Sequence, residues 1–138
     1  MAVFASSDDF YAVMQVIFDR LIADPSATKD FQSRKMLVRI KGSDPEVELL
    51  LNGKTDPIGA STGPQPGRAD LEMLLPVDLL HGILTDQESL KAAFMDGRLK
   101  VTGNVFRAMQ LADLFRKIEA IYPQVMQEQG FSVSGRAQ

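Results

Sequence analysis

The sequence contains no cysteine and no tryptophan, and its single histidine is His81. Without cysteine the protein can form no disulfide, no thiolate metal site and no cysteine nucleophile, so packing must supply its stability. His81 lies among leucine and isoleucine residues, with no serine or carboxylate directly beside it. A Ser-His-Asp triad therefore has no basis, and we interpret His81 as a helix-surface or hydrogen-bonded residue. We predict that the protein is not an enzyme.

Basic residues are not in excess, and long apolar runs are missing. The formal net charge is -3 and the isoelectric point is about 5.1, whereas nucleic-acid binding rests largely on clustered lysine and arginine. No stretch approaches the roughly 20 apolar residues that span a bilayer, and the first residues do not resemble a secretion signal. We therefore expect a cytoplasmic protein that does not bind nucleic acid.

Motifs for metals and cofactors are also missing. The glycines form neither a Gly-x-Gly-x-x-Gly fingerprint nor a phosphate-binding loop, and we interpret them as turn residues. Two acidic groups, Asp8-Asp9 and Asp44-x-Glu46-x-Glu48, do not match a calcium-binding loop. They suit a helix start, a turn and a solvent-facing strand better. We expect no metal ion and no cofactor.

A length of 138 residues suits one domain with one core. We predict that residues 1–130 form this domain and that residues 131–138 are a flexible tail. Apolar residues recur at helical spacing in residues 8–23, and Ser7 is the predicted cap of this helix. The Asp24-Pro25 pair closes it, and residues 28–34 add a further turn or two of helix.

Apolar and polar residues alternate in several segments, which predicts strands. These segments are residues 36–41, 47–51, 70–75 and 98–102. The polar turn at residues 42–45 joins the first two strands into an antiparallel hairpin. A short edge strand is expected within residues 57–62, in a loop rich in glycine and proline.

The second half of the chain is mostly helical in its pattern. Residues 77–84 form a short predicted helix, and the spacing Thr85-x-x-Glu88 predicts a capping box that starts the next one. A long amphipathic helix is expected from Val105 to Ile121. Pro123 is predicted to break or restart it.

Seven methionines and eight phenylalanines supply adaptable apolar side chains. Methionine fills irregular space and re-packs around varied shapes, so these residues could line a pocket for a flexible ligand. They could equally be ordinary core residues, and both interpretations stay open at this point. The methionines concerned are Met14, Met36, Met73, Met95, Met109 and Met126.

A family resemblance is specific over residues 69–115 and concerns only the order of elements before them. Its motif lies in residues 90–115. The residues that carry it are, in chain order, Ala93-Phe94, Gly97, Leu99-Lys100, Gly103 and Met109-Gln110-Leu111. An Ala-Phe pair, a glycine, a Leu-Lys strand, a second glycine and a Met-x-Leu helix in this order resemble the sterol carrier protein-2 family. Two features depart from the family pattern. Asn104 follows the second glycine where the family often has aspartate, and residues 54–67 match no family motif.

The resemblance implies an α+β fold in which helices cover a mostly antiparallel five-stranded sheet, with an apolar tunnel between the layers. It also implies non-catalytic binding, and transfer within the cell, of a lipid or other hydrophobic small molecule. A fatty acid, a quinone or a phospholipid is at least as suitable as a sterol. The alternative is a protein-interaction or accessory module of a lipid- or quinone-processing complex. Expected partners are the lipid-like molecule, a membrane in transient contact, and a partner protein.

Apolar residues of the predicted strands and helices are expected to face the cavity. They are Met73, Leu75, Phe94, Leu99, Val101, Phe106 and Met109. The helix after Gly103 is the predicted movable wall. The competing interpretation is that several of these residues fill a solid core.

Overall fold

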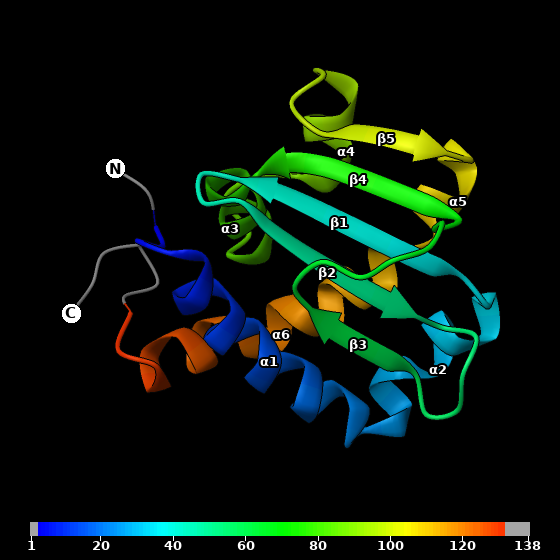
Figure 1. Cartoon of the computed structure of the whole chain (residues 1–138), viewed down its shortest axis with the longest axis horizontal. Coiled ribbons are helices and arrows are strands. Elements are labelled where there is room, and N and C mark those ends of the chain that lie inside the picture. Colours follow the sequence, from blue (N-terminus) through cyan, green and yellow to red (C-terminus); the bar gives the residue numbers. More distant parts are fainter. Residues whose placement is uncertain (1–2, 132–138) are drawn as a thin grey trace.

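Five β-strands form one sheet, and helices cover one of its faces in the computed structural model (Figure 1). The structure describes residues 3–131, so the predicted tail beyond Phe131 lies outside the described residues. The strands are β1 (Leu37–Ser43), β2 (Val47–Asn52), β3 (Gly59–Thr62), β4 (Leu71–Pro76) and β5 (Lys100–Gly103). The helices are α1 (Ser7–Ile22), α2 (Pro25–Arg34), α3 (Val77–Leu84), α4 (Leu90–Met95), α5 (Val105–Met109) and α6 (Ala112–Glu128). The predicted α+β class is confirmed.

The sheet is mostly antiparallel, with the strand order β3-β2-β1-β4-β5. β1 and β2 pair antiparallel with Ile40 opposite Leu49, which confirms the predicted hairpin. β4 pairs with β1 in parallel, with Ile40 opposite Met73, and β5 pairs antiparallel with β4. The chain must therefore cross β2 and β1 after it leaves the edge strand β3, before β4 can begin.

The core lies between the sheet and the helix layer. Val38, Ile40 and Met73 point from the central strands to the helix side and are buried. α6 contacts α1, α2 and α3 and is thus the central helix of the covering layer. Burial of one large apolar side chain stabilises a fold by roughly 1.5–3 kcal/mol, so this interface is the main source of stability. Within residues 3–131 no helix is both long and apolar enough to cross a membrane.

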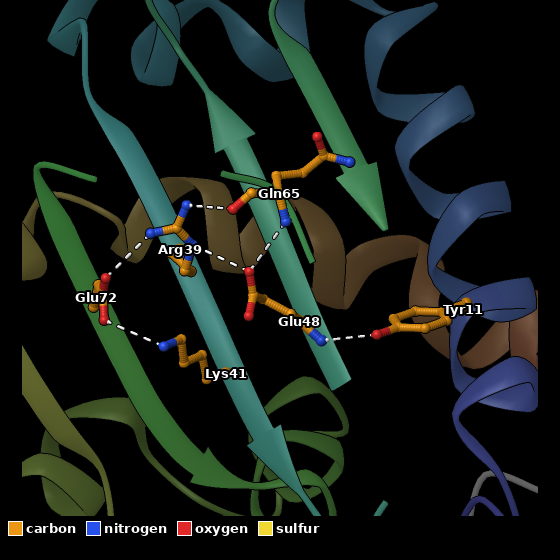
Figure 2. Close-up of polar contacts among 6 residues, drawn as sticks. All are labelled: Tyr11, Arg39, Lys41, Glu48, Gln65 and Glu72. Atoms are coloured by element: carbon orange, nitrogen blue, oxygen red, sulfur yellow. Dashed lines mark hydrogen bonds and ion pairs between the residues drawn. The ribbon is translucent and has the colours of Figure 1, made fainter. Parts of the chain in front are cut away.

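A buried arginine lies on the opposite face of the sheet. Arg39 points away from the helices, yet only 5% of its surface is exposed. Its guanidinium lies 3.2 Å from a carboxylate oxygen of both Glu48 and Glu72, and it donates to the carbonyl of Gln65 at 3.0 Å (Figure 2). The N–H of Gln65 in turn donates to the carboxylate of Glu48 at 3.3 Å. These contacts fix the crossover between β3 and β4 over the open face of the sheet.

The first two helices start at other residues than predicted. Ser6 caps α1, because its hydroxyl accepts a backbone N–H of the first turn. Ser7 instead donates its hydroxyl to the carbonyl of Glu46 at 2.6 Å, next to the β1–β2 turn. Pro25 is the first residue of α2 and Asp24 is its cap. A proline suits this position because the first N–H groups of a helix have no helical partner.

Thr85 does not start α4, so the predicted capping box is wrong. Its hydroxyl donates to the carbonyl of His81 at 2.8 Å, and the residue ends α3. In the next turn the backbone N–H groups of Gln87 and Glu88 both donate to the carbonyl of Gly82. α4 begins only after Ser89, whose hydroxyl accepts a backbone N–H of its first turn. The Thr85-x-x-Glu88 spacing allows a capping box. Because the chain turns back after α3, however, the Thr85 hydroxyl and the Glu88 N–H both donate to carbonyls of α3.

The long helix expected after residue 104 is divided into α5 and α6. Between them, the N–H groups of Gln110 and Leu111 bond to carbonyls three residues back, which tightens the turn. α6 then continues through Pro123, so the predicted break there is wrong. A proline inside a helix costs roughly 3 kcal/mol. Burial of the neighbouring Val125 and Met126 offsets this cost.

Asp70 binds the first residue of β1 at the start of the parallel β1–β4 pair. The N–H of Leu37 donates to the Asp70 carboxylate at 2.9 Å, and the N–H of Asp70 donates to the carbonyl of Leu37 at 2.8 Å. The Lys54 ammonium lies 3.1 Å from the same carboxylate. The hydrogen bond from Leu37, followed by that from Lys54, holds the pKa of Asp70 below its usual value.

We predict that Asp70→Asn lowers the free energy of unfolding at neutral pH by about 1 kcal/mol, because the charged acceptor is lost. A lowered folded-state pKa stabilises the protein above the unfolded-state pKa, and this contribution disappears as the pH falls through the folded-state value. Urea unfolding from neutral to acidic pH should therefore show a difference from wild type that shrinks on the acid side. The control is Asp19→Asn, at an exposed aspartate of α1. A loss that does not change with pH would contradict the role of the charge.

Candidate functional site

A small pocket lies between α4, α5 and the β4–β5 end of the sheet. Its empty volume is about 270 Å³, and part of this space opens to solvent. Its lining consists of Met73, Leu90, Phe94, Leu99, Val101, Val105, Ala108 and Met109. All of these described lining residues are apolar, so the pocket can bury apolar surface and supplies no acid, base or nucleophile.

The floor of the pocket is formed by β4 and β5. Met73 and Val101 are directly opposite each other in the antiparallel register, so their side chains lie on the same face of the sheet. Leu99 lies just before β5, and its N–H donates to the carbonyl of Ala93 at 3.0 Å. This hydrogen bond ties the floor to α4, which carries the pocket residue Phe94.

The outer wall is α5, a helix of five residues. The side-chain oxygen of Asn104 caps it by accepting the N–H of Phe106 at 2.9 Å. The Arg107 guanidinium donates to the carbonyl of Arg34 at the end of α2, also at 2.9 Å. Within α5 only Ala108 is buried. Because so little of it is packed, we expect α5 to be the part of the pocket that moves most easily.

The structure brings five of the seven predicted cavity residues together at this pocket. They are Met73, Phe94, Leu99, Val101 and Met109. Leu75 is buried on the same strand but does not belong to the lining. Phe106 lies outside the pocket and 83% of its surface is exposed, so the expectation that it faces the cavity is corrected. Helical spacing turns residues 105, 108 and 109 inward and residue 106 outward. Contact of any of these residues with a ligand stays a prediction.

Sequence analysis missed three residues of the lining, namely Leu90, Val105 and Ala108. Leu90 lies one helical turn before Phe94, and the other two share a helix face with Met109. These spacings were a usable signal. The pattern of residues 105–121 predicts one helix with a single wide apolar face, and this wide face conceals the spacings.

The enclosed part of the pocket has room for about one water molecule, because the 270 Å³ includes space open to solvent. It is therefore far smaller than the small-molecule sites of roughly 300–1,000 Å³ found in other proteins. A long acyl chain needs more space than this, and an outward movement of α5 would supply it. The continuous apolar tunnel expected from the family resemblance stays a prediction.

His81 is buried between α3 and α6, and it does not line the pocket. Its Nδ1 atom lies 2.7 Å from the hydroxyl of Tyr122, which confirms the hydrogen-bonded interpretation. Burial, and to a lesser extent the charge of Asp78, raises the pKa of Tyr122, so its hydroxyl stays protonated. In residues 3–131 no group of three His, Asp or Glu side chains is arranged to hold a metal ion.

Comparison with known families decides the classification. The model of the SCP-2 sterol transfer family matches residues 17–116, which include every element that lines the pocket. The chain belongs to the SCP-2 sterol transfer family. No curated protein sequence matches the chain.

Solved structures with the SCP-2 fold resemble this one. Sterol Carrier Protein 2 from Yarrowia lipolytica, in its apo form, has a TM-score of 0.65 and 18% identity over 80% of this chain and 92% of that chain. Sterol carrier protein domain 2 of Helicoverpa armigera has a TM-score of 0.62 and 18% identity over 81% and 89%. A structure named UbiJ-SCP2 Ubiquinone synthesis protein has a TM-score of 0.60 and 19% identity over 80% and 92%. At these identities the likeness shows the fold alone.

In this member of the SCP-2 family one glycine, Gly97, precedes β5 and another, Gly103, is its last residue. Gly97 and Gly103 have φ angles of 84° and 115°, a region in which other residues are strained. A Cβ atom at Gly103 would also lie 2.6 Å from the carbonyl oxygen of Asp70, whereas one at Gly97 would meet nothing within 4 Å. Gly103 therefore allows β5 to end in close contact with the start of β4, which sets the position of the pocket floor.

We predict that Gly103→Ala lowers the free energy of unfolding by roughly 2–4 kcal/mol, from backbone strain together with the close contact. Gly97→Ala introduces the strain without the contact and should cost about 1–2 kcal/mol. The two variants are a matched pair, and urea unfolding of both measures the difference. Equal losses would show that the close approach to Asp70 does not restrict residue 103.

Proposed function

We propose that the protein binds a lipid or another hydrophobic small molecule reversibly in the pocket between α4, β5 and α5, and that it catalyses no reaction. One observation carries this proposal. In a member of the SCP-2 family, helices and strands from both layers bring together a pocket whose lining is apolar throughout.

Burial alone would supply a useful affinity. Each buried methylene contributes about 0.8 kcal/mol, so about ten of them would contribute on the order of 8 kcal/mol before the cost of ordering the ligand. No polar side chain belongs to the described lining. We therefore expect the polar end of a ligand to stay at the open mouth in water, and the pocket to select for apolar shape more than for the head group.

Entry of a long chain requires α5 to move. Val105, Ala108 and Met109 all reach the pocket from this one helix, so an outward shift of α5 enlarges the pocket along one side. The hydrogen bond from Arg107 to Arg34 is the described polar contact that ties α5 to α2. Transfer of the ligand within the cell, and the cytoplasmic location expected from the sequence, remain parts of the proposal.

A second function is the presentation of a quinone-like molecule to an enzyme complex. It is supported by the fold of the structure named UbiJ-SCP2 Ubiquinone synthesis protein. The exposed ring of Phe106 beside the pocket offers a surface that a partner protein could cover. Both functions use the same pocket and differ in whether a protein partner is needed.

Native mass spectrometry of the purified protein, followed by organic extraction, tests whether a ligand is bound. We expect a stoichiometric hydrophobic molecule, or uptake of one on incubation with fatty acids, phospholipids or quinones. An apo mass that none of these ligands changes would overturn the binding proposal. It would favour an interaction module that acts through protein contacts.

We predict that Ala108→Phe blocks the pocket, because its ring would occupy the space of the ligand. Affinity for a fluorescent fatty acid should fall at least about tenfold, which corresponds to about 1.4 kcal/mol. Ala120→Phe adds the same ring at an exposed position of α6 and should leave the affinity unchanged. If both variants bind like wild type, the ligand occupies another site.

A further inference from the structure

The methionines of the chain fall into two groups by their exposure to solvent. The sequence has no cysteine, so methionine carries all of its sulfur. Met95 and Met109 are 72% and 45% exposed. The other methionines within residues 3–131 are at most 2% exposed, and they are Met14, Met36, Met73 and Met126. Oxidation of a methionine depends on access to its sulfur, so we expect Met95 and Met109 to react first with an oxidant in solution.

Met109 differs from Met95 because it lies at the pocket. Its side chain belongs to the lining together with that of Met73, whereas Met95 lies outside the lining. Met73 forms part of the floor and is 1% exposed. The same pocket therefore contains one thioether that an oxidant in solution reaches and one that is protected.

We propose that Met109 is a reversible oxidation site through which peroxide controls the pocket. The Met109 sulfur donates an electron pair to one oxygen of hydrogen peroxide, and the O–O bond breaks as the S–O bond forms. The second oxygen leaves as water after it takes up the proton of the first. Sulfur is oxidised to the sulfoxide and peroxide is reduced to water. Methionine sulfoxide reductases reverse the oxidation.

A sulfoxide does not suit the position that the Met109 thioether occupies. Its oxygen is a polar acceptor, and no polar side chain belongs to the described lining. Burial of this oxygen without a donor is unfavourable, so the oxidised side chain turns toward water, which its partial exposure allows. The pocket then loses one wall, and α5 keeps only Val105 and Ala108 in the lining.

Few other contacts hold α5 in place. Ala108 is the one buried residue of this helix, and its described side-chain hydrogen bonds are the cap from Asn104 and the bond from Arg107 to Arg34. Loss of the Met109 contact therefore favours local opening of α5. The effect of oxidation on ligand binding rests on the proposed function. The site of oxidation and the opening of α5 do not.

Peptide mapping by mass spectrometry after mild treatment with hydrogen peroxide locates the oxidised residues. We expect Met95 and Met109 to react at least about tenfold faster than Met73, because they are exposed and Met73 is buried. A saturating fluorescent fatty acid should slow the oxidation of Met109 and leave that of Met95 unchanged. Oxidation of Met109 that is no faster than that of Met73 would overturn the proposal.

The matched variants Met109→Leu and Met95→Leu separate the two exposed sulfurs. Leucine is close to methionine in volume and has no sulfur to oxidise. Each variant is treated with peroxide and titrated with the fluorescent fatty acid beside its own untreated form. Treatment should weaken binding by Met95→Leu about tenfold and should not change binding by Met109→Leu. A methionine sulfoxide reductase should restore the lost affinity. An equal loss in both variants, or no loss in Met95→Leu, would overturn the proposal.

Hydrogen exchange supplies a measurement that needs no ligand. After peroxide treatment the amides of α5 should lose protection in Met95→Leu but not in Met109→Leu, while those of α6 stay protected. If the untreated protein binds no hydrophobic ligand, the proposed function is overturned, and faster exchange in α5 still supports the oxidation site. Unchanged exchange in α5 after complete oxidation of Met109 would overturn the oxidation proposal and leave the proposed function standing.

Discussion

The parallel pairing of β1 with β4 is the constraint on which the rest of the fold depends. β2 and β3 extend the sheet on one side of β1. After β3 the chain must therefore cross β2 and β1 to reach the other side of β1, where β4 lies. Arg39 holds this return over the open face through Glu48, Glu72 and Gln65 (Figure 2). A buried guanidinium is tolerated because Glu72 and Gln65 accept hydrogen bonds from it and the carboxylates of Glu48 and Glu72 balance its charge. Without β4 in this place, β5 would have no strand to pair with and the pocket would have no floor.

The pocket lies where the helix layer is least packed. α6 has six buried side chains and contacts three other helices, whereas α4 and α5 each bury a single alanine, Ala93 and Ala108. Opening the layer at this point disturbs few core contacts, which suits a site that must admit a ligand. The same two helices expose apolar side chains and carry basic residues. The proposed route of ligand entry therefore lies on one short part of the chain.

Patterns between neighbouring residues were sufficient to predict most elements and part of the site. Alternation in residues 70–75 and 98–102 placed Met73 and Val101 on one face, and their pairing in the sheet is what brings them together. Signals that rest on one or two residues were less informative. Thr85 had the spacing of a cap and ends a helix instead, while Pro123 lies inside a helix that burial of its neighbours maintains. At Pro123 tertiary burial outweighed a local preference, whereas at Thr85 one local hydrogen bond, to the carbonyl four residues back, replaced another.

The sequence by itself determined the types of element, the absence of cysteine chemistry and, through its resemblance, the family. Only the tertiary structure decided that β1 and β4 run parallel, that Arg39 is buried, and that Met109 lines the pocket while Phe106 faces outward. The physical reason is that periodicity depends on residues adjacent along the chain. Burial and pocket shape depend instead on which distant segments meet, and Phe106 and Met109 differ only in the direction that α5 gives them.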